Sequence, residues 1–187
     1  MKNIITRNFF LSIIAAVFVI AAIISTTHNT QAYSYAGFKW YSYPVSVDMS
    51  DASLPGSWTT PIANAMSAWN AASSPFYFNV GYSGHLITLE NKGAGYAARS
   101  RVSGSGDQIT DIDLVFNTYY SWSTSGGAGA FDVQNIATHE FGHWLALNDL
   151  SGAGNTEKTM YYQAAYGETK KRTLESDDLN GINYIYP

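Results

Sequence analysis

The chain has 187 residues, contains no cysteine, and carries 10 basic and 14 acidic residues, for a formal net charge of −4. Without cysteine it can form no disulfide, and it offers no cysteine to which a lipid could be attached. The acidic balance and the lack of a basic patch argue against nucleic acid as a partner, and the length suits one domain.

The N-terminal end has the pattern of an export signal. Lys2 and Arg7 provide a positive start, residues 9–24 form an apolar run, and Thr30 and Ala32 offer a small-residue cleavage site before Tyr33. The apolar run is slightly long for a signal core and short for a membrane-spanning helix of about 20 residues. A signal that is retained as a membrane anchor is therefore the alternative.

We expect a signal peptide at residues 1–32 and a single folded domain at residues 33–187. On this interpretation the protein is secreted and extracellular, and it meets a membrane only if the signal stays as an anchor. Removal of Lys2 and Arg7 takes away two positive charges and no acidic residue, so the expected mature chain has a formal charge of −6.

Hydrophobic periodicity predicts strands that alternate with helices early in the chain, and then a helical end. The expected strands are residues 39–49, 76–80, 85–90, 96–102 and 109–117. The expected helices are residues 57–72, 131–147 and 173–185. In the first helix Pro61 suits the first turn, and Ile62, Met66 and Trp69 share one face.

The second helix carries the residues that indicate chemistry. Its apolar residues recur near helical spacing, and Asp132 is placed to cap its start. Within it, His139 and His143 are four residues apart, so both imidazoles project from one face and can hold one Zn²⁺, with Glu140 beside the water that the metal binds. Such a motif can arise by chance, and a His and Glu cluster can be only a solvated helix face. A buried helix, however, needs something to satisfy these polar groups, and a metal does so.

Landmarks in one order along the chain make it resemble a matrixin, a branch of the metzincin zinc endopeptidases. They are the segments 109–117 and 131–143, the pair Met160 and Tyr161, and Asp177 and Asp178 followed by 181–182 and 185–186. The resemblance implies an α+β metzincin zincin fold. Its five-stranded mixed twisted sheet, mostly parallel with one antiparallel edge strand, would pack on two long helices, with a C-terminal helix.

The resemblance also implies where a substrate would bind. The cleft would run between the edge strand, residues 96–102, and the C-terminal part of the chain, and the edge strand would pair with an extended peptide. Met160 would form an apolar floor beneath the metal ligands, a role close to that of an ordinary core residue. Tyr161, Tyr162 and Tyr166 are expected to wall the specificity pocket.

Two positions depart from the usual matrixin pattern H-E-x-x-H-x-x-G-x-x-H. Ala146 occupies the glycine position, and Asp149 replaces the third histidine. We expect Asp149 to be the third zinc ligand, as in the related snapalysins. A left-handed backbone at Ala146 would cost roughly 1–2 kcal/mol unless Asn148 takes that conformation instead. The alternative is that Asp149 only caps the turn, and that Asn148 or a second water fills the coordination site.

Further metals have weaker support in the sequence. Calcium is a candidate because Asp107, Asp111, Asp113 and Asn117 supply oxygens near glycine-rich turns, although acids at strand ends are usually only solvated. We expect no second, structural zinc, because His85 is the single spare histidine after the signal.

The sequence thus predicts a secreted zinc metalloendopeptidase that hydrolyses peptide bonds of extended polypeptides through a metal-activated water. One catalytic Zn²⁺ would be held by His139, His143 and Asp149, and Glu140 would be the catalytic base. A protein or peptide substrate and a monomeric state are expected. One alternative is a catalytically impaired metzincin that binds a peptide or partner, and another is a structural or surface-binding protein that zinc only stabilises.

Overall fold

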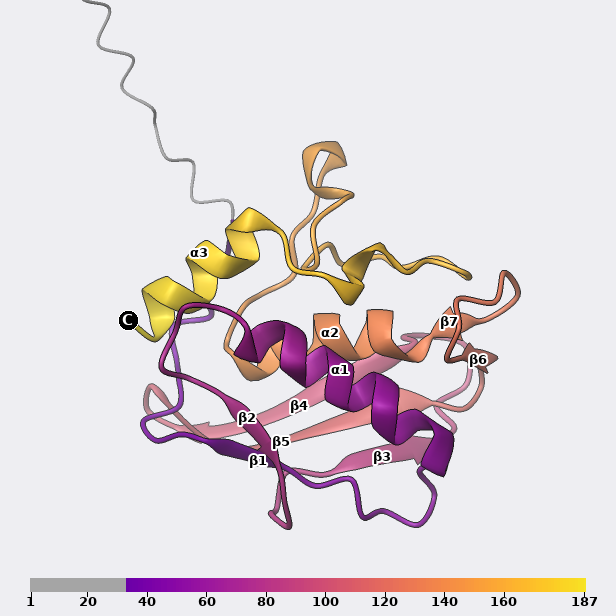
Figure 1. Cartoon of the computed structure of the whole chain (residues 1–187), viewed down its shortest axis with the longest axis horizontal. Coiled ribbons are helices and arrows are strands. Elements are labelled where there is room, and N and C mark those ends of the chain that lie inside the picture. The colour runs from indigo at the N-terminus through magenta and orange to yellow at the C-terminus, as the bar shows by residue number, and fades with distance from the viewer. Residues whose placement is uncertain (1–32) are drawn as a thin grey trace, which may run out of the picture. The chain divides into compact units, whose positions relative to one another are not determined.

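The computed structural model describes residues 33–187, so the signal peptide expected at residues 1–32 lies outside the described residues. Across residues 33–187, no helix is both long enough and apolar enough to cross a membrane. Strands and helices alternate early, and the chain ends in helices (Figure 1).

The described chain contains short strands, two long helices, a C-terminal helix and three 3-10 turns. The strands are β1 (Val45–Val47), β2 (Phe78–Val80), β3 (Ile87–Glu90), β4 (Ala98–Ser105), β5 (Gln108–Asn117), β6 (Trp122–Ser123) and β7 (Phe131–Asp132). The helices are α1 (Thr59–Asn70), α2 (Val133–Trp144) and α3 (Ser176–Ile185), and the 3-10 turns are η1 (Gly56–Trp58), η2 (Ala153–Asn155) and η3 (Lys170–Arg172).

The strands do not form the single five-stranded sheet that was expected. β1 pairs in parallel with β2, and separately β5 lies between β3, which is parallel to it, and β4, which is antiparallel. One isolated bridge between Asp48 and Leu86 joins the two groups. The Asp48 carboxylate accepts hydrogen bonds from the backbone N–H groups of Ser50 (2.9 Å) and Ser83 (3.2 Å), so the chain turns there and the ladder ends.

All five expected strands are nevertheless present, with the expected orientations and with β4 as the antiparallel edge. The pair of β6 with β7 was not predicted. Both strands are two residues long, which is too short for a periodic pattern to be visible in the sequence.

Helices α1 and α2 pack side by side and lie on the same side of the strands (Figure 1). The predicted face of α1 is buried, with Ile62 and Trp69 fully inaccessible. The indole N–H of Trp69 donates a hydrogen bond to the carbonyl oxygen of Thr138 in α2 at 2.8 Å. This bond and the surrounding apolar contacts fix the position of α2 relative to α1.

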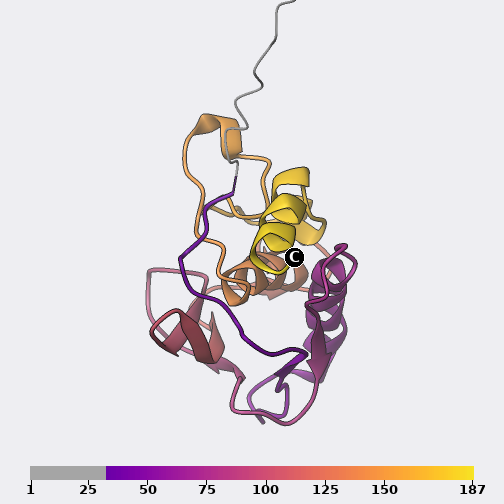
Figure 2. The same cartoon turned by 90° about the vertical axis from the view of Figure 1, so that its left-hand side faces the viewer.

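The chain beyond α2 is mostly irregular, and α3 lies above α2 in the view of Figure 2. α3 begins later than expected, because Glu175 and Asp178 form a capping box there. Gly181 of α3 packs against Leu147 and Tyr33, and a Cβ at this glycine would come within 2.8 Å of the Leu147 side chain. The segment just after α2 is thus covered by both ends of the described chain.

Candidate metal centre and cleft

The start of α2 is fixed by Asp132, as predicted. Its carboxylate accepts a hydrogen bond from the Asn135 N–H at 2.9 Å, which is an N-cap interaction. Arg172 of η3 donates two more bonds to the same carboxylate, at 2.8 and 2.6 Å. The buried Asp132 thereby ties the helix that carries both histidines to the C-terminal segment.

Both histidines of α2 are oriented by a hydrogen bond at the ring nitrogen that faces away from the cleft. His139 Nδ1 lies 2.8 Å from the Thr159 carbonyl oxygen, and His143 Nδ1 lies 2.7 Å from that of Leu147. A carbonyl oxygen can only accept, so both Nδ1 atoms carry the proton. The Nε2 lone pairs of both rings are therefore free to bind a metal.

Asp149 reaches the histidines because the chain reverses sharply after α2. Ala146 has a φ of 66°, so the left-handed position falls on the alanine and Asn148 does not replace it. The Ala36 N–H donates to the Ala146 carbonyl at 2.8 Å, and the Asn148 N–H donates to the Ser34 carbonyl at 2.7 Å. Backbone pairing with the N-terminal segment therefore holds the strained turn.

The three predicted ligands converge on one point. Asp149 Oδ1 lies 3.2 Å from His139 Nε2 and 3.6 Å from His143 Nε2, and across residues 33–187 these three form the one such group of His, Asp and Glu side chains. Ligand atoms on a tetrahedral zinc are about 3.3 Å apart. With both Nδ1 atoms bonded to carbonyl oxygens, the two Nε2 atoms and the carboxylate oxygen face one another, and a cation, either a proton or a metal ion, is needed between them. The donor set therefore fits Zn²⁺.

The environment of Asp149 favours its charged form. Burial acts to raise the pKa of this carboxyl, but the contact with His139 and the fields of His143 and Lys171 outweigh it and hold the pKa below its ordinary value. A carboxyl group must be ionised to bind a metal, so this environment keeps Asp149 in the form that can bind a cation.

Glu140 lies next to the ligands and is held by the edge strand. Its Oε2 accepts two hydrogen bonds from Ser100 of β4, one from the N–H and one from the hydroxyl, both at 2.8 Å. The Ser100 hydroxyl also lies 3.2 Å from the Glu140 carbonyl oxygen. This carboxylate is therefore oriented by β4 and is not itself one of the converging ligands.

Met160 packs against α2 at Gly142, next to the turn of helix that carries the two histidines. It is almost fully buried, and a Cβ at Gly142, between the two histidines, would lie 2.2 Å from the Met160 sulfur. The glycine thus allows the thioether to approach the helix directly, and the sulfur supplies an apolar floor.

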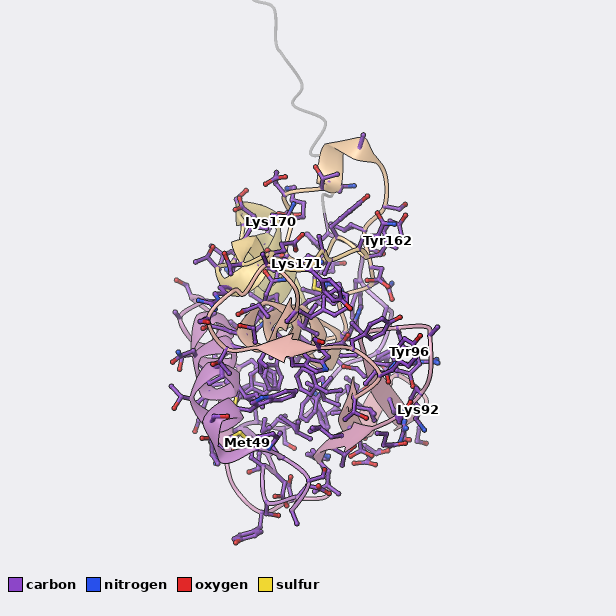
Figure 3. All side chains as sticks on the ribbon, turned by 90° about the vertical axis from the view of Figure 1, so that its right-hand side faces the viewer. Met49, Lys92, Tyr96, Tyr162, Lys170 and Lys171 are labelled. Carbon is purple, nitrogen blue, oxygen red and sulfur yellow. The ribbon has the colours of Figure 1, made fainter. Side chains whose placement is uncertain are left out.

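A cleft of about 1040 Å³ contains the site, and both the edge strand and the C-terminal segment line it, as expected. In Figure 3 Tyr96, which precedes β4, and Tyr162 lie on the same side of the molecule, and Lys171 lies further toward its centre. Tyr161 and Tyr162, which were expected to wall the specificity pocket, line this cleft. Tyr166 does not line it and packs against Phe131, with ring centroids 4.6 Å apart, so its expected role in the pocket wall is wrong.

The candidate calcium oxygens are engaged with separate partners. Asp107 accepts from the Tyr41 hydroxyl, Asp111 contacts His85 at 2.9 Å, and Asp113 accepts from a backbone N–H. Asn117 is buried and donates to two carbonyl oxygens. Each of these groups is thus used in holding loops and strand ends together.

Three contributors to the site were not anticipated from the sequence. They are Ser100, which holds Glu140, Thr159, which orients His139, and Lys171, which is buried in the wall of the cleft. Thr159 acts through its backbone carbonyl and Ser100 partly through its backbone N–H, and no residue type reveals such backbone contacts. Lys171 stands between Lys170 and Arg172, so in the sequence it looks like part of a solvated basic run.

A protein-family model described as Matrixin matches residues 56–187 of this chain. The match includes α1, the edge strand, the α2 motif and the C-terminal segment. It therefore spans every element that lines the candidate site except the N-terminal segment that pairs with the turn after α2.

Individual relatives match over shorter stretches. Metalloendoproteinase 1 of Glycine max is 31% identical over 83 residues, which are 41% of this chain and 26% of that protein. Neutrophil collagenase of Homo sapiens is 34% identical over 74 residues, 40% of this chain and 15% of that protein. Matrix metalloproteinase-25 of Homo sapiens is 32% identical over 83 residues, 43% of this chain and 14% of that protein. The chain thus matches about a quarter or less of the length of these relatives.

Proposed function

Because this chain belongs to the matrixin family of peptidases, we propose that it is a zinc metalloendopeptidase that hydrolyses peptide bonds in extended polypeptides. His139, His143 and Asp149 would hold one catalytic zinc, and Glu140 would be the general base. This proposal is based on three atoms that converge on one point. They are the Nε2 atoms of two histidines that are protonated at Nδ1, and one carboxylate oxygen of Asp149. When bound, zinc lowers the pKa of a coordinated water and polarises a carbonyl.

Glu140 would move the proton. It would accept a proton from the attacking water and return it to the leaving amine, which needs no covalent intermediate. The two hydrogen bonds from Ser100 fix Oε2, so the carboxylate stays in one rotamer beside the ligands. Because Ser100 belongs to β4, these bonds also fix the position of the Glu140 carboxylate relative to the strand that lines the cleft.

The edge of β4 would bind the substrate backbone. The Ala97 carbonyl accepts a bond from Asn117 of β5, whereas the Ser100 N–H faces the opposite way, toward Glu140. Backbone groups alternate along a strand, so those of Ala98 and Val102 also face away from β5. An extended peptide could pair with them on either side of the base, and a substrate held in this way is recognised mainly through its backbone.

Substitution of Glu140 tests the mechanism. Glu140→Ala is expected to lower cleavage of a denatured protein by about a hundredfold to ten-thousandfold, while zinc content stays at one per chain, because Glu140 does not hold the metal. A zinc chelator should abolish wild-type cleavage, and added zinc should restore it. Retention of more than a few per cent of activity in Glu140→Ala would reject the role of this base.

The same experiment separates the peptidase from the alternatives. A wild-type protein that contains zinc but cleaves nothing would instead be a peptide-binding module or a protein that zinc only stabilises. Glu140 argues against both alternatives, because it is present and oriented by Ser100. Neither a binding module nor a purely structural metal needs a base beside the metal site.

We further propose that the protein is exported and acts as a monomer. The export proposal is based on the signal pattern of residues 1–32. The monomer proposal is based on the site, since one chain supplies all three metal donors, the base and both walls of the cleft.

A further inference from the structure

A buried lysine in the wall of the cleft is not used by the proposed mechanism. Lys171 of η3 is only 1% exposed, and it lines the same cleft as His139 and Glu140. Lysine is rarely buried without a partner, because an ammonium that leaves water loses its hydration. Its burial therefore calls for a physical explanation.

The position of Lys171 is fixed on both sides. Its N–H donates a hydrogen bond at 2.8 Å to the side-chain oxygen of Asn135, in the first turn of α2. The next residue, Arg172, is bonded to Asp132 at the helix start. The backbone of η3 is thus attached to α2, and this attachment directs the Lys171 side chain along the cleft wall to Tyr161, whose carbonyl oxygen accepts a bond from Nζ.

Lys171 differs from the two basic residues that flank it. Within residues 33–187, Lys170 pairs with Glu157 at 3.1 Å and Arg172 pairs with Asp132 at 2.6 Å, whereas Lys171 forms no ion pair. Among the acidic groups, Glu168 in the cleft wall acts most strongly on Lys171, but it accepts a bond from Asn135 at 3.3 Å and lies 3.9 Å from Lys170. The ammonium has three donors, and the Tyr161 carbonyl takes one of them.

Burial makes the charged form of the Lys171 side chain unfavourable. Burial lowers its pKa to about 8, and the nearby charges of Glu168, Asp149 and Glu140 act in the opposite direction. A carboxylate that entered the cleft would supply the missing acceptor and would be shielded from water on arrival. Charge-assisted hydrogen bonds of this kind are the stronger ones in proteins.

We propose that Lys171 is a specificity-determining residue, and that it binds the carboxylate of a Glu or Asp side chain in the substrate. The inference deepens the proposed function and depends on it, because it names the class of polypeptide that the cleft would prefer. Backbone pairing with β4 tolerates many sequences, whereas Lys171 adds one charged contact at one side-chain position.

Kinetics with matched peptides test the proposal. One set of peptides with blocked termini carries Glu or Gln at each position from three residues before to three residues after the scissile bond, and kcat/KM is measured for each. The wild-type protein should prefer Glu over Gln by about tenfold or more at one position, because hydrogen bonds to charged groups are worth about 1.5–3 kcal/mol. In Lys171→Gln the ratio of kcat/KM for the Glu and Gln peptides should fall to about one, while Lys92→Gln, which removes a lysine outside the cleft, should keep the wild-type ratio.

Several outcomes would overturn the proposal. These are equal rates for Glu and Gln at every position in the wild type, a preference that persists in Lys171→Gln, and a preference that is lost in Lys170→Gln instead. A uniform loss of activity in Lys171→Gln with the preference intact would also overturn it, because Lys171 would then only hold the Tyr161 wall. A second set of the Gln peptides with a free C-terminus separates the two sources of a carboxylate. Faster cleavage of this set than of the blocked set, lost in Lys171→Gln and without a preference for Glu, would assign the carboxylate to the chain end and not to a side chain.

A second variant covers the case in which Lys171→Gln does not fold. Lys171→Arg keeps the charge and should retain the preference for Glu, and equal rates in that variant would again contradict the proposal. Failure of the wild-type protein to cleave any peptide would refute the peptidase function itself, so the two failures can be told apart.

Discussion

Helix α2 and the turn that follows it hold the proposed ligands in different ways. His139 and His143 lie on a regular helix, and each ring is fixed by a hydrogen bond to a carbonyl oxygen. Asp149 follows an alanine with a φ of 66°, and its side chain is 55% exposed. The helix sets its ligand positions by its own geometry, whereas the turn depends on other segments to hold its ligand in place.

One of these segments begins the described chain, and the other follows the turn closely. Ser34 and Ala36 bond to the turn on one side, and the Leu150 N–H donates to the Met160 carbonyl at 2.7 Å on the other. A ligand whose position depends on contacts with other segments should be easier to displace, and water should replace it more readily. The difference predicts an ordered set of effects on zinc binding and stability.

Removal of a ligand should have the largest effect, and it should differ between the two regions. His143→Ala is expected to weaken zinc binding by at least about a hundredfold, and Asp149→Ala by about tenfold or more, because water can take the place of the exposed Asp149 more readily. Competition with a chromophoric chelator measures both values. Asp149→Asn, which keeps an oxygen but not the charge, should fall between Asp149→Ala and the wild type. Unchanged affinity in Asp149→Ala would mean that this residue is not a ligand.

The support of His139 extends to α3, and this gives a pH-dependent effect. Thr159, whose carbonyl orients His139, donates from its hydroxyl to the Thr173 carbonyl at 3.1 Å and lies close to Asp178 of α3. Burial raises the pKa of Asp178 from 3.8 to about 6, with a smaller contribution from the charge of Asp177. The folded state therefore keeps a proton that the unfolded chain loses, and the free energy of unfolding should fall as pH rises from about 4 to 6.

Asp178→Asn should remove this fall. Such a shift in pKa corresponds to on the order of 3 kcal/mol, so the difference in unfolding free energy between variant and wild type should change by about that amount from pH 4 to pH 7. Urea unfolding with chelator present in both samples measures it without the pH dependence of zinc binding. Parallel curves for the two proteins would show that Asp178 does not titrate in this range.

The smallest effect concerns the turn itself. Ala146→Gly should raise the free energy of unfolding by about 1 kcal/mol, because glycine adopts a positive φ without the steric cost that alanine meets. The melting temperature should increase by about 2–4 °C. Ala137→Gly, a control inside α2, should have the opposite sign, since glycine is unfavourable within a helix. A less stable Ala146→Gly would mean that the turn is not strained.

The sequence predicted what depends on local periodicity and spacing. The two proposed ligands on α2, the Asp132 cap and the five strands could be predicted because each is encoded by neighbouring residues. The sheet break at Asp48 could not, since it results from a side chain that bonds to Ser83, 35 residues away. Lys171 was missed for the same reason, because its burial depends on its packing against Asn135 and Tyr161 and not on its neighbours in the sequence.

The pairing of the N-terminal segment with the turn has a consequence for the order of folding. Ser34 and Asn148 are 114 residues apart in the chain, so the ladder that holds the Asp149 turn closes a very long loop. Contacts between such distant residues form slowly, and on the ribosome they cannot form before Asn148 has been synthesised. The proposed third ligand, Asp149, thus reaches its place near the end of folding. The two histidines, in contrast, are brought together as soon as α2 forms.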